Sequence, residues 1–84
     1  MKSIRTQYSY YTAWRNETGQ LHREDGPAVE HSDGHQIWYL NGKRHRVDGP
    51  ALEDANGYKS WWLNGKSCKS RKEFEQLIKL KAFW

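Results

Sequence analysis

The stretch His22-Arg23-Glu24-Asp25-Gly26-Pro27-Ala28 returns as His45-Arg46-Val47-Asp48-Gly49-Pro50-Ala51, at an offset of 23 residues. In the same way, Trp38-Tyr39-Leu40-Asn41-Gly42-Lys43 returns as Trp61-Trp62-Leu63-Asn64-Gly65-Lys66. Residues 22–43 and 45–66 are identical at 13 of 22 aligned positions. A short fixed period is the signature of stacked repeats, in which each unit buries its surface only against its neighbours. The repeat therefore predicts an architecture of successive similar units.

Each repeat contains two turn signals between aromatic or apolar runs. Asn41-Gly42 and Asn64-Gly65 favour type I′ hairpin turns, because both central residues of that turn need a positive φ. The second signals are the Asp-Gly and Asn-Gly pairs within residues 32–34 and 55–57. Strands are predicted between the turns, at residues 28–31, 35–40, 51–54 and 58–63. Each unit also contains a proline, which we expect at a strand start or sheet edge, and a glycine before it, which permits a bend. The prolines are Pro27 and Pro50, and the glycines are Gly26 and Gly49.

The chain outside the two repeats completes the predicted domain. Residues 8–21 look like a degenerate first unit with a longer loop at 16–19, and the repeats follow at 22–44 and 45–67. The terminal segment, 70–83, opens with a capping box from Ser70 to Glu73, and we expect a helix from Arg71 to about Ala82 that covers the end of the sheet. Its apolar stripe has helical spacing and consists of Phe74, Leu77 and Ile78, with Leu80 and Trp84 beside it. The predicted fold is mainly β: one domain (1–84), an antiparallel β-meander of 23-residue hairpin repeats with a short C-terminal α-helix.

Composition narrows the class of protein. Only 36% of the 84 residues are hydrophobic, but five Trp and five Tyr argue for a folded, thin domain rather than a disordered chain. The net charge is +4, and residues 43–84 hold 10 basic and 5 acidic groups, which suits either an anionic partner or a merely solvated surface. A single Cys68 excludes an internal disulfide and points to a reducing compartment. No signal peptide or membrane span is evident, so we expect a cytoplasmic protein with no membrane partner.

The repeated His-Arg-x-Asp motif invites a chemical interpretation. We favour a structural one, in which the Asp holds a local turn and the Arg pairs with an Asp of the same or the adjacent unit. Contact with an anionic ligand and acid–base catalysis are the alternatives. The residues concerned are His22, Arg23, Asp25, His45, Arg46 and Asp48. The four histidines lack the spacing of metal ligands, so neither a metal nor another cofactor is expected.

The aromatic strand residues are predicted to divide between the two faces of the sheet. Alternation along a strand places Trp38 and Trp61 in register on one face and Tyr39 and Trp62 on the other. One row should be core, and in a single-layer sheet the other stays exposed, where it can stack on bases or pack on a protein. The predicted binding surface is the second row with its basic neighbours: Tyr39, Trp62, Lys43, Arg44, Lys66 and Lys69.

The unit resembles MORN-type repeats, and most of all the variant found in small bacteriophage and bacterial proteins. The resemblance rests on residues 38–51, where an aromatic Asn-Gly-Lys hairpin precedes His-Arg-x-Asp-Gly-Pro-Ala, and it extends over roughly 14–66. It implies an extended β-meander used for contacts with proteins or lipid headgroups, with no catalytic residues to carry over. His-Arg-x-Asp-Gly-Pro stands here in place of the alternating glycines of ordinary MORN units.

Three functions follow as hypotheses. The first is a non-enzymatic binding protein, phage-encoded, that binds and inhibits a host protein in the host cytoplasm through the aromatic and basic face. The second is a protein that binds or sequesters a nucleic acid or nucleotide. The third is a small metal-dependent nuclease that uses His45 and Asp. Exposed sheet edges also suit a homodimer.

Overall fold

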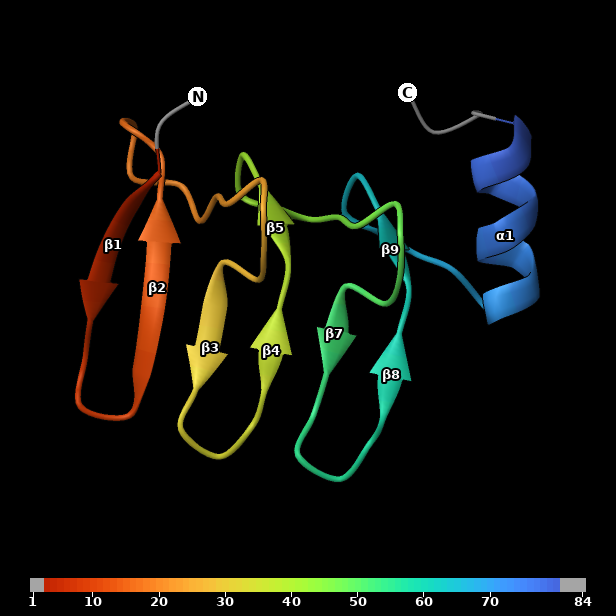
Figure 1. Ribbon diagram of the computed structural model, residues 1–84. Helices are drawn as coiled ribbons and strands as arrows, with labels where there is room; N and C mark the ends of the chain where they lie inside the picture. The colour runs from red at the N-terminus through yellow and green to blue at the C-terminus, as the bar shows by residue number, and fades with distance from the viewer. Residues whose placement is uncertain (1–2, 81–84) are drawn as a thin grey trace.

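The computed structural model describes residues 3–80. Its centre is a six-stranded antiparallel sheet in the order β1-β2-β3-β4-β7-β8 (Figure 1). The strands are β1 (Ile4–Gln7), β2 (Tyr11–Arg15), β3 (Val29–His31), β4 (Gln36–Ile37), β7 (Leu52–Glu53) and β8 (Lys59–Ser60). The predicted antiparallel meander is confirmed. Its first strand, β1, precedes residue 8 and so lies outside the first unit that the sequence suggests.

Two short hairpins continue the central strands at one end of the sheet. β5 (Tyr39–Leu40) pairs with β6 (Lys43–Arg44), and β9 (Trp62–Leu63) pairs with β10 (Lys66–Ser67). Asn41 and Asn64 have positive φ angles of 49° and 50°. The glycine after each also has a positive φ, of 81° and 82°. The type I′ turns are therefore confirmed, because only this turn needs two successive positive φ angles.

The strands predicted at 35–40 and 58–63 are each divided in two. The division falls at Trp38 and Trp61, where the backbone changes its partner strand. The Trp38 amide donates to the Ala51 carbonyl (2.7 Å), whereas the Trp38 carbonyl accepts from the His45 amide (3.2 Å). Each aromatic run thus belongs to the main sheet at one end and to a hairpin at the other.

The remaining turns agree with the sequence. Gly34 and Gly57 take positive φ angles of 104° and 89° in the turns at 32–34 and 55–57. Pro27 and Pro50 lie two residues before β3 and β7, at the strand starts. The longer first loop is also present, because the Asn16 amide donates to the Gln20 carbonyl across it (2.9 Å).

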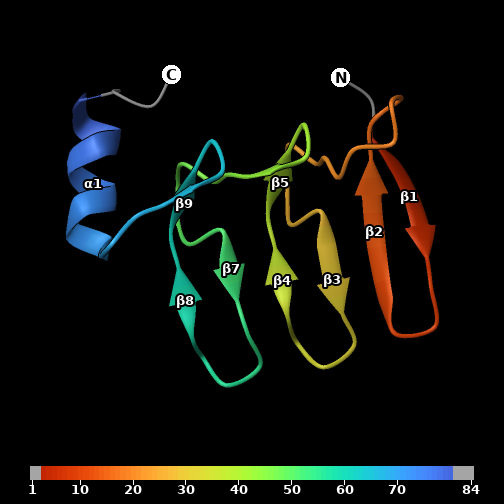
Figure 2. The same cartoon turned by 180° about the vertical axis from the view of Figure 1, so that it is seen from behind.

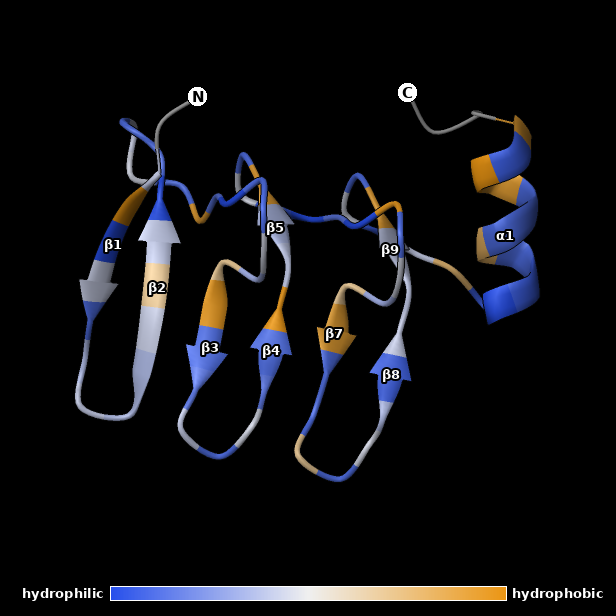
Figure 3. Cartoon of the chain, viewed as in Figure 1, coloured by the Kyte–Doolittle hydropathy of each residue, from blue (hydrophilic) through white to orange (hydrophobic). Residues whose placement is uncertain are grey.

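The molecule is a single thin layer, 38 × 31 × 16 Å, and its buried residues are mostly small. The expectation that one row of aromatic residues forms the core is wrong, because Trp38, Tyr39, Trp61 and Trp62 are all only half-buried. One sheet without a second layer cannot enclose an indole. Figure 3 shows apolar residues gathered where β3, β4 and β7 lie side by side. The buried residues are Ala13, Ala28, Val29, Ala51, Leu63, Cys68 and Phe74, together with polar Asn16, His22 and His45.

The C-terminal helix α1 (Arg71–Leu80) stands at the end of the sheet, beside β8 and β9 (Figures 1 and 2). The Ser70 hydroxyl accepts the Glu73 amide (3.1 Å), and the Glu73 carboxylate accepts the Lys69 amide rather than that of Ser70. Phe74 is buried against Leu63 and Cys68, with Leu77, Ile78 and Trp61 around them. Leu80 is 73% exposed and does not join the stripe. The predicted helix end near Ala82 and Trp84 lie outside the described residues.

Replacement of Phe74 by Ala should loosen the helix from the sheet. Removal of a buried phenyl ring costs about 3 kcal/mol, because the transfer energy is lost and a cavity remains. Urea unfolding followed by far-UV circular dichroism measures this loss. Leu80→Ala on the same helix is the matched control and should change the free energy of unfolding by less than about 0.5 kcal/mol. Equal effects of the two substitutions would contradict the packing of α1.

Candidate functional site: two faces of a single-layer sheet

The sheet has two faces, and the alternation of side chains decides which residues share each. Along β4 and β5, Ile37 and Tyr39 point to one side and Trp38 and Leu40 to the other. We call these the Tyr39 face and the Trp38 face. One unit later, Trp62 lies on the Tyr39 face and Trp61 and Leu63 lie on the Trp38 face. The predicted division of the aromatic residues follows from this alternation.

On the Trp38 face, arginines cover the indole rings. The Arg46 guanidinium carbon lies 4.0 Å from the Trp38 ring centroid, and Arg23 lies 3.9 Å from that of Trp14. The sequence predicts Trp38 and Trp61 in register on one face. The structure places a cation on the rings of Trp38 and Trp14, which is a favourable contact with the negative ring face.

Two residues of its own motif also bind the Arg46 guanidinium. Its Nε donates to Asp48 Oδ1 (2.8 Å) and its Nη1 donates to the Pro50 carbonyl (3.0 Å). A Cβ atom at Gly49 would lie 2.9 Å from the guanidinium carbon. The pairing of Arg with Asp of the same unit is therefore confirmed. Gly49 lies in a bend, as expected, but its φ is not positive, and the close approach of the guanidinium is the reason that a glycine is needed here. The first repeat repeats this geometry with Arg23, Asp25, Pro27 and Gly26.

Each motif histidine ties the start of its unit to the Asn-Gly turn near the end of the same unit. His45 Nδ1 accepts the Asn64 amide (2.9 Å), and His22 Nδ1 accepts the Asn41 amide (3.0 Å). Both side chains are buried, with 6% and 2% of the residue exposed. An Nδ1 atom that accepts carries no proton, so the geometry assigns the neutral tautomer with its proton on Nε2. The sequence carries a signal for this bond, since His and Asn recur 19 residues apart, but its meaning needs the three-dimensional arrangement.

Burial acts on the protonation of His45. Desolvation disfavours the charged form and lowers the pKa of His45 below its ordinary value of 6.5. A proton on Nδ1 would also oppose the Asn64 N–H that this nitrogen accepts. The bond between His45 and Asn64 within the unit thus requires neutral histidine, and His45 has no free Nδ1 lone pair for the general-base role that a nuclease would need.

The Tyr39 face gathers three of the predicted binding residues. Arg44 Nε donates to Tyr39 Oη (3.3 Å), and the Arg44 guanidinium carbon lies 4.9 Å from the Trp62 ring centroid. Trp62 Nε1 donates to Ser60 Oγ (2.8 Å). Tyr39, Arg44 and Trp62 are each half-buried. They form one cluster with an aromatic surface and a central positive charge.

The lysines of the predicted surface lie elsewhere, which corrects that prediction. Lys43 pairs with Leu40, and Lys66 pairs with Leu63, so both are on the Trp38 face. The reason is the two-residue period of a strand: Lys43 and Arg44 are adjacent and point to opposite faces. Lys69 is exposed beside the start of α1, and its backbone amide is bound by Glu73.

A ring ladder on the Tyr39 face was not foreseen. Tyr8 stacks on Tyr11 with centroids 4.5 Å apart, and Tyr11 stacks on His31 at 5.2 Å. Arg15 Nη1 donates to Tyr8 Oη (2.9 Å). The ladder depends on the pairing of Tyr11 with His31 across β2 and β3. That register connects residues whose separation in the chain shows no periodic signal.

Histidines also meet in one turn without forming a metal centre. His31 and His35 have ring centroids 5.8 Å apart, and His35 Nδ1 lies 2.8 Å from Asp33 Oδ1. Hydrogen bonds from His35 hold the pKa of the Asp33 carboxyl below its ordinary value. Within residues 3–80, no three His, Cys, Asp or Glu side chains are grouped as metal ligands.

Comparison with family models, curated proteins and solved structures finds no match to this chain. The part of the chain that the structure describes contains no helix long and apolar enough to cross a membrane.

Gly49→Ala should cost about 1–2 kcal/mol of unfolding free energy, because the new methyl group displaces the Arg46 guanidinium from its aromatic and carboxylate partners. In an Arg46→Ala background the same change should cost almost nothing, since no guanidinium remains to be displaced. Chemical denaturation of the four proteins in this cycle measures the coupling. Simple additivity of the two costs would show that glycine serves another purpose.

Acid should destabilise the protein through His45. Because the folded pKa is below 6.5, the unfolded state takes up a proton first as the pH falls, and stability that is full above 6.5 declines below it. Urea unfolding between pH 7.5 and 5 measures the decline, and NMR titration of the His45 ring tests the pKa directly. His31→Gln, at an exposed position, is the control and should retain the decline. A folded pKa of His45 at or above 6.5 would refute this account.

Proposed function

We propose that the protein is a non-enzymatic binding module of MORN-like repeats that contacts a partner protein through the Tyr39 face. The observation that supports the proposal is that the aromatic side chains of the two faces have different surroundings. On the Trp38 face, the arginines cover Trp14 and Trp38, and α1 packs beside Trp61. On the Tyr39 face, half-buried aromatic side chains stand in a layer only 16 Å thick.

The chemistry of the Tyr39 face favours a protein over a nucleic acid. An apolar row crosses the strands beside the aromatic cluster, because Val29 pairs with Ile37 and Ile37 pairs with Leu52. Aromatic residues and arginine dominate the energetically important centres of protein interfaces, whereas lysine is depleted there. Lys43 and Lys66 point to the other face, so among residues 3–80 no row of lysines accompanies the aromatic cluster.

The partner and its location come from the resemblance, which supports a small phage or bacterial protein that binds a host protein in the cytoplasm. Inhibition would follow where the Tyr39 face covers a working surface of that partner. The single buried Cys68 thiol suits a reducing compartment. A homodimer stays a prediction, and the edge strand β1, with all four residues exposed, is where it would form.

The test compares two double variants that differ in face. Tyr39→Ala with Trp62→Ala removes the aromatic cluster, and Lys43→Glu with Lys66→Glu alters the Trp38 face only. Each protein is immobilised, a partner is captured from host lysate, and the affinity of the purified partner is then measured. Loss of two aromatic anchors should weaken binding by about 30-fold or more. The lysine variant should bind almost as the original chain does.

Two results would refute the proposal. One is full affinity of a folded Tyr39→Ala, Trp62→Ala protein, with folding checked by circular dichroism. The other is capture of nucleic acid in place of protein, with an affinity that falls steeply between low and moderate salt.

A further inference from the structure

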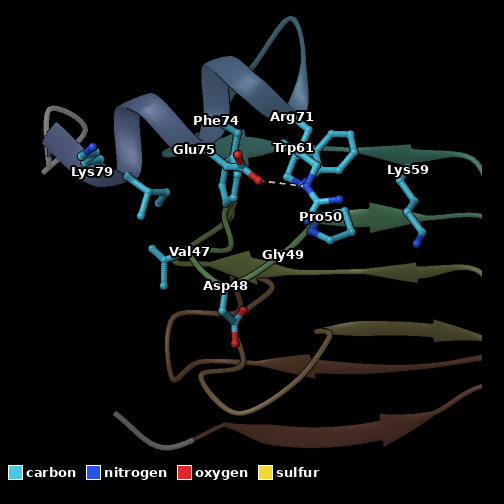
Figure 4. Close-up of a pocket in the computed structure, with 11 residues that line it drawn as sticks. Val47, Asp48, Gly49, Pro50, Lys59, Trp61, Arg71, Phe74, Glu75 and Lys79 are labelled. Atoms are coloured by element: carbon cyan, nitrogen blue, oxygen red, sulfur yellow. Dashed lines mark hydrogen bonds and ion pairs between the residues drawn. The ribbon is translucent and has the colours of Figure 1, made fainter.

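A groove separates the last repeat from α1. Its volume is about 520 Å³, and it is bounded by the 47–50 segment on one side and by the helix on the other. Figure 4 shows Trp61, Phe74 and Pro50 at its centre, with Lys59 and Lys79 toward opposite ends. The groove is on the Trp38 face, because it is lined by Trp61 and lies away from Tyr39, Arg44 and Trp62.

The groove exists because the repeat is incomplete at this position. In the two preceding units, an arginine covers the tryptophan of the strand before it. For Trp61 the equivalent residue is Lys69, where the chain turns into α1 instead. Phe74 contacts the Trp61 ring at a tilt of 42°, with centroids 6.5 Å apart. Trp61 therefore contributes to an apolar floor together with Pro50 and Ile78.

The charges around this floor are not balanced. Asp48 accepts from Arg46 at 2.8 Å, and Glu75 accepts from Arg71 at 3.0 Å, so both acidic residues of the groove are already paired. Lys59 and Lys79 form no ion pair among residues 3–80. The groove thus offers an apolar centre with a cation toward each end and no unpaired carboxylate.

We infer that this groove binds a linear acidic segment of a partner protein. An apolar side chain of the segment lies on Trp61 between Pro50 and Ile78, and carboxylates on both sides of it meet Lys59 and Lys79. An arginine from a partner, which would imitate the motif of the repeat itself, lacks a free carboxylate here and would meet two cations. The inference does not depend on the Tyr39 face, since the two surfaces are on opposite sides of the sheet.

The test is an NMR titration of the full chain with a short synthetic peptide in which aspartate and glutamate flank a central leucine. The amide signals of residues 47–50, Trp61 and the α1 residues that line the groove should shift in a saturable manner. Lys59→Glu with Lys79→Glu should weaken the peptide by about tenfold or more, since two attractive pairs become repulsive. Replacement of the central leucine by glycine should weaken it as well.

Lys43→Glu with Lys66→Glu is the matched control, because it makes the same change in net charge on the same face outside the groove. It should alter the affinity by less than about threefold at physiological salt, where distant charges are screened. Tyr39→Ala with Trp62→Ala should leave peptide binding intact, which separates this inference from the proposed function.

Four outcomes would overturn the inference. They are the absence of saturable shifts, equal losses in the two lysine variants, equal affinity for a peptide with lysines in place of its acidic residues, and displacement of the peptide from these residues by a single-stranded oligonucleotide.

Discussion

The hydrogen bond from the Asn64 amide to His45 Nδ1 is the contact on which the shape of each repeat depends, because it ties the start of the 45–67 unit to the turn near the end of the same unit. A single-layer sheet has no second layer against which to bury apolar side chains, and the interiors of its units are accordingly small, as at Ala28 and Ala51. Cohesion within each unit must then come from directional contacts. A buried acceptor that meets a turn amide satisfies two polar groups at once, and leaving either without its partner would cost more than the bond itself contributes. The same hydrogen bond, from the Asn41 amide to His22 Nδ1, is present in the preceding unit.

This means of cohesion determines which face is left for binding. The motif arginines, their carboxylates and the neighbouring glycines lie on the Trp38 face. Their contacts there stabilise the fold. Guanidinium, aspartate and histidine next to each other suggest catalysis in a sequence, yet here each is engaged by its own unit or by its neighbour. On the Tyr39 face, the described rings contact one another in the ladder of Tyr8, Tyr11 and His31 or contact the cations Arg15 and Arg44. The alternation of one strand thus places the arginine motif and the Tyr39 cluster on opposite faces, and the groove beside α1 shares the face of the motif.

The sequence predicted the architecture well because its signals are local. Asn-Gly turns, strand starts after proline and the Ser70 cap each depend on backbone preferences within a few residues, and each is present. The candidate surface was predicted only in part, because it depends on which neighbours share a face. Lys43 and Arg44 are adjacent in sequence, which suggests a single basic patch, but the two-residue period of the strand places their side chains on opposite faces. The ladder of Tyr8, Tyr11 and His31 depends on which residue of β2 pairs with which residue of β3. The positions of turns and apolar runs in the sequence do not specify this register.

The end of the array explains residues that depart from the motif. Cys68 occupies the place of the histidine, and the residues after it form α1 in place of a strand and an Asn-Gly turn, so no turn amide there needs an acceptor. A small apolar side chain is then the better occupant, and Cys68 packs with Leu63 and Phe74, where burial raises the pKa of its thiol and keeps it neutral. Lys69 in place of arginine leaves the ring of Trp61 without its cation, and Phe74 covers only part of what the arginine would have covered. Helix α1 therefore does not cover Trp61 as completely as another repeat would, and the space left beside Trp61 is the groove.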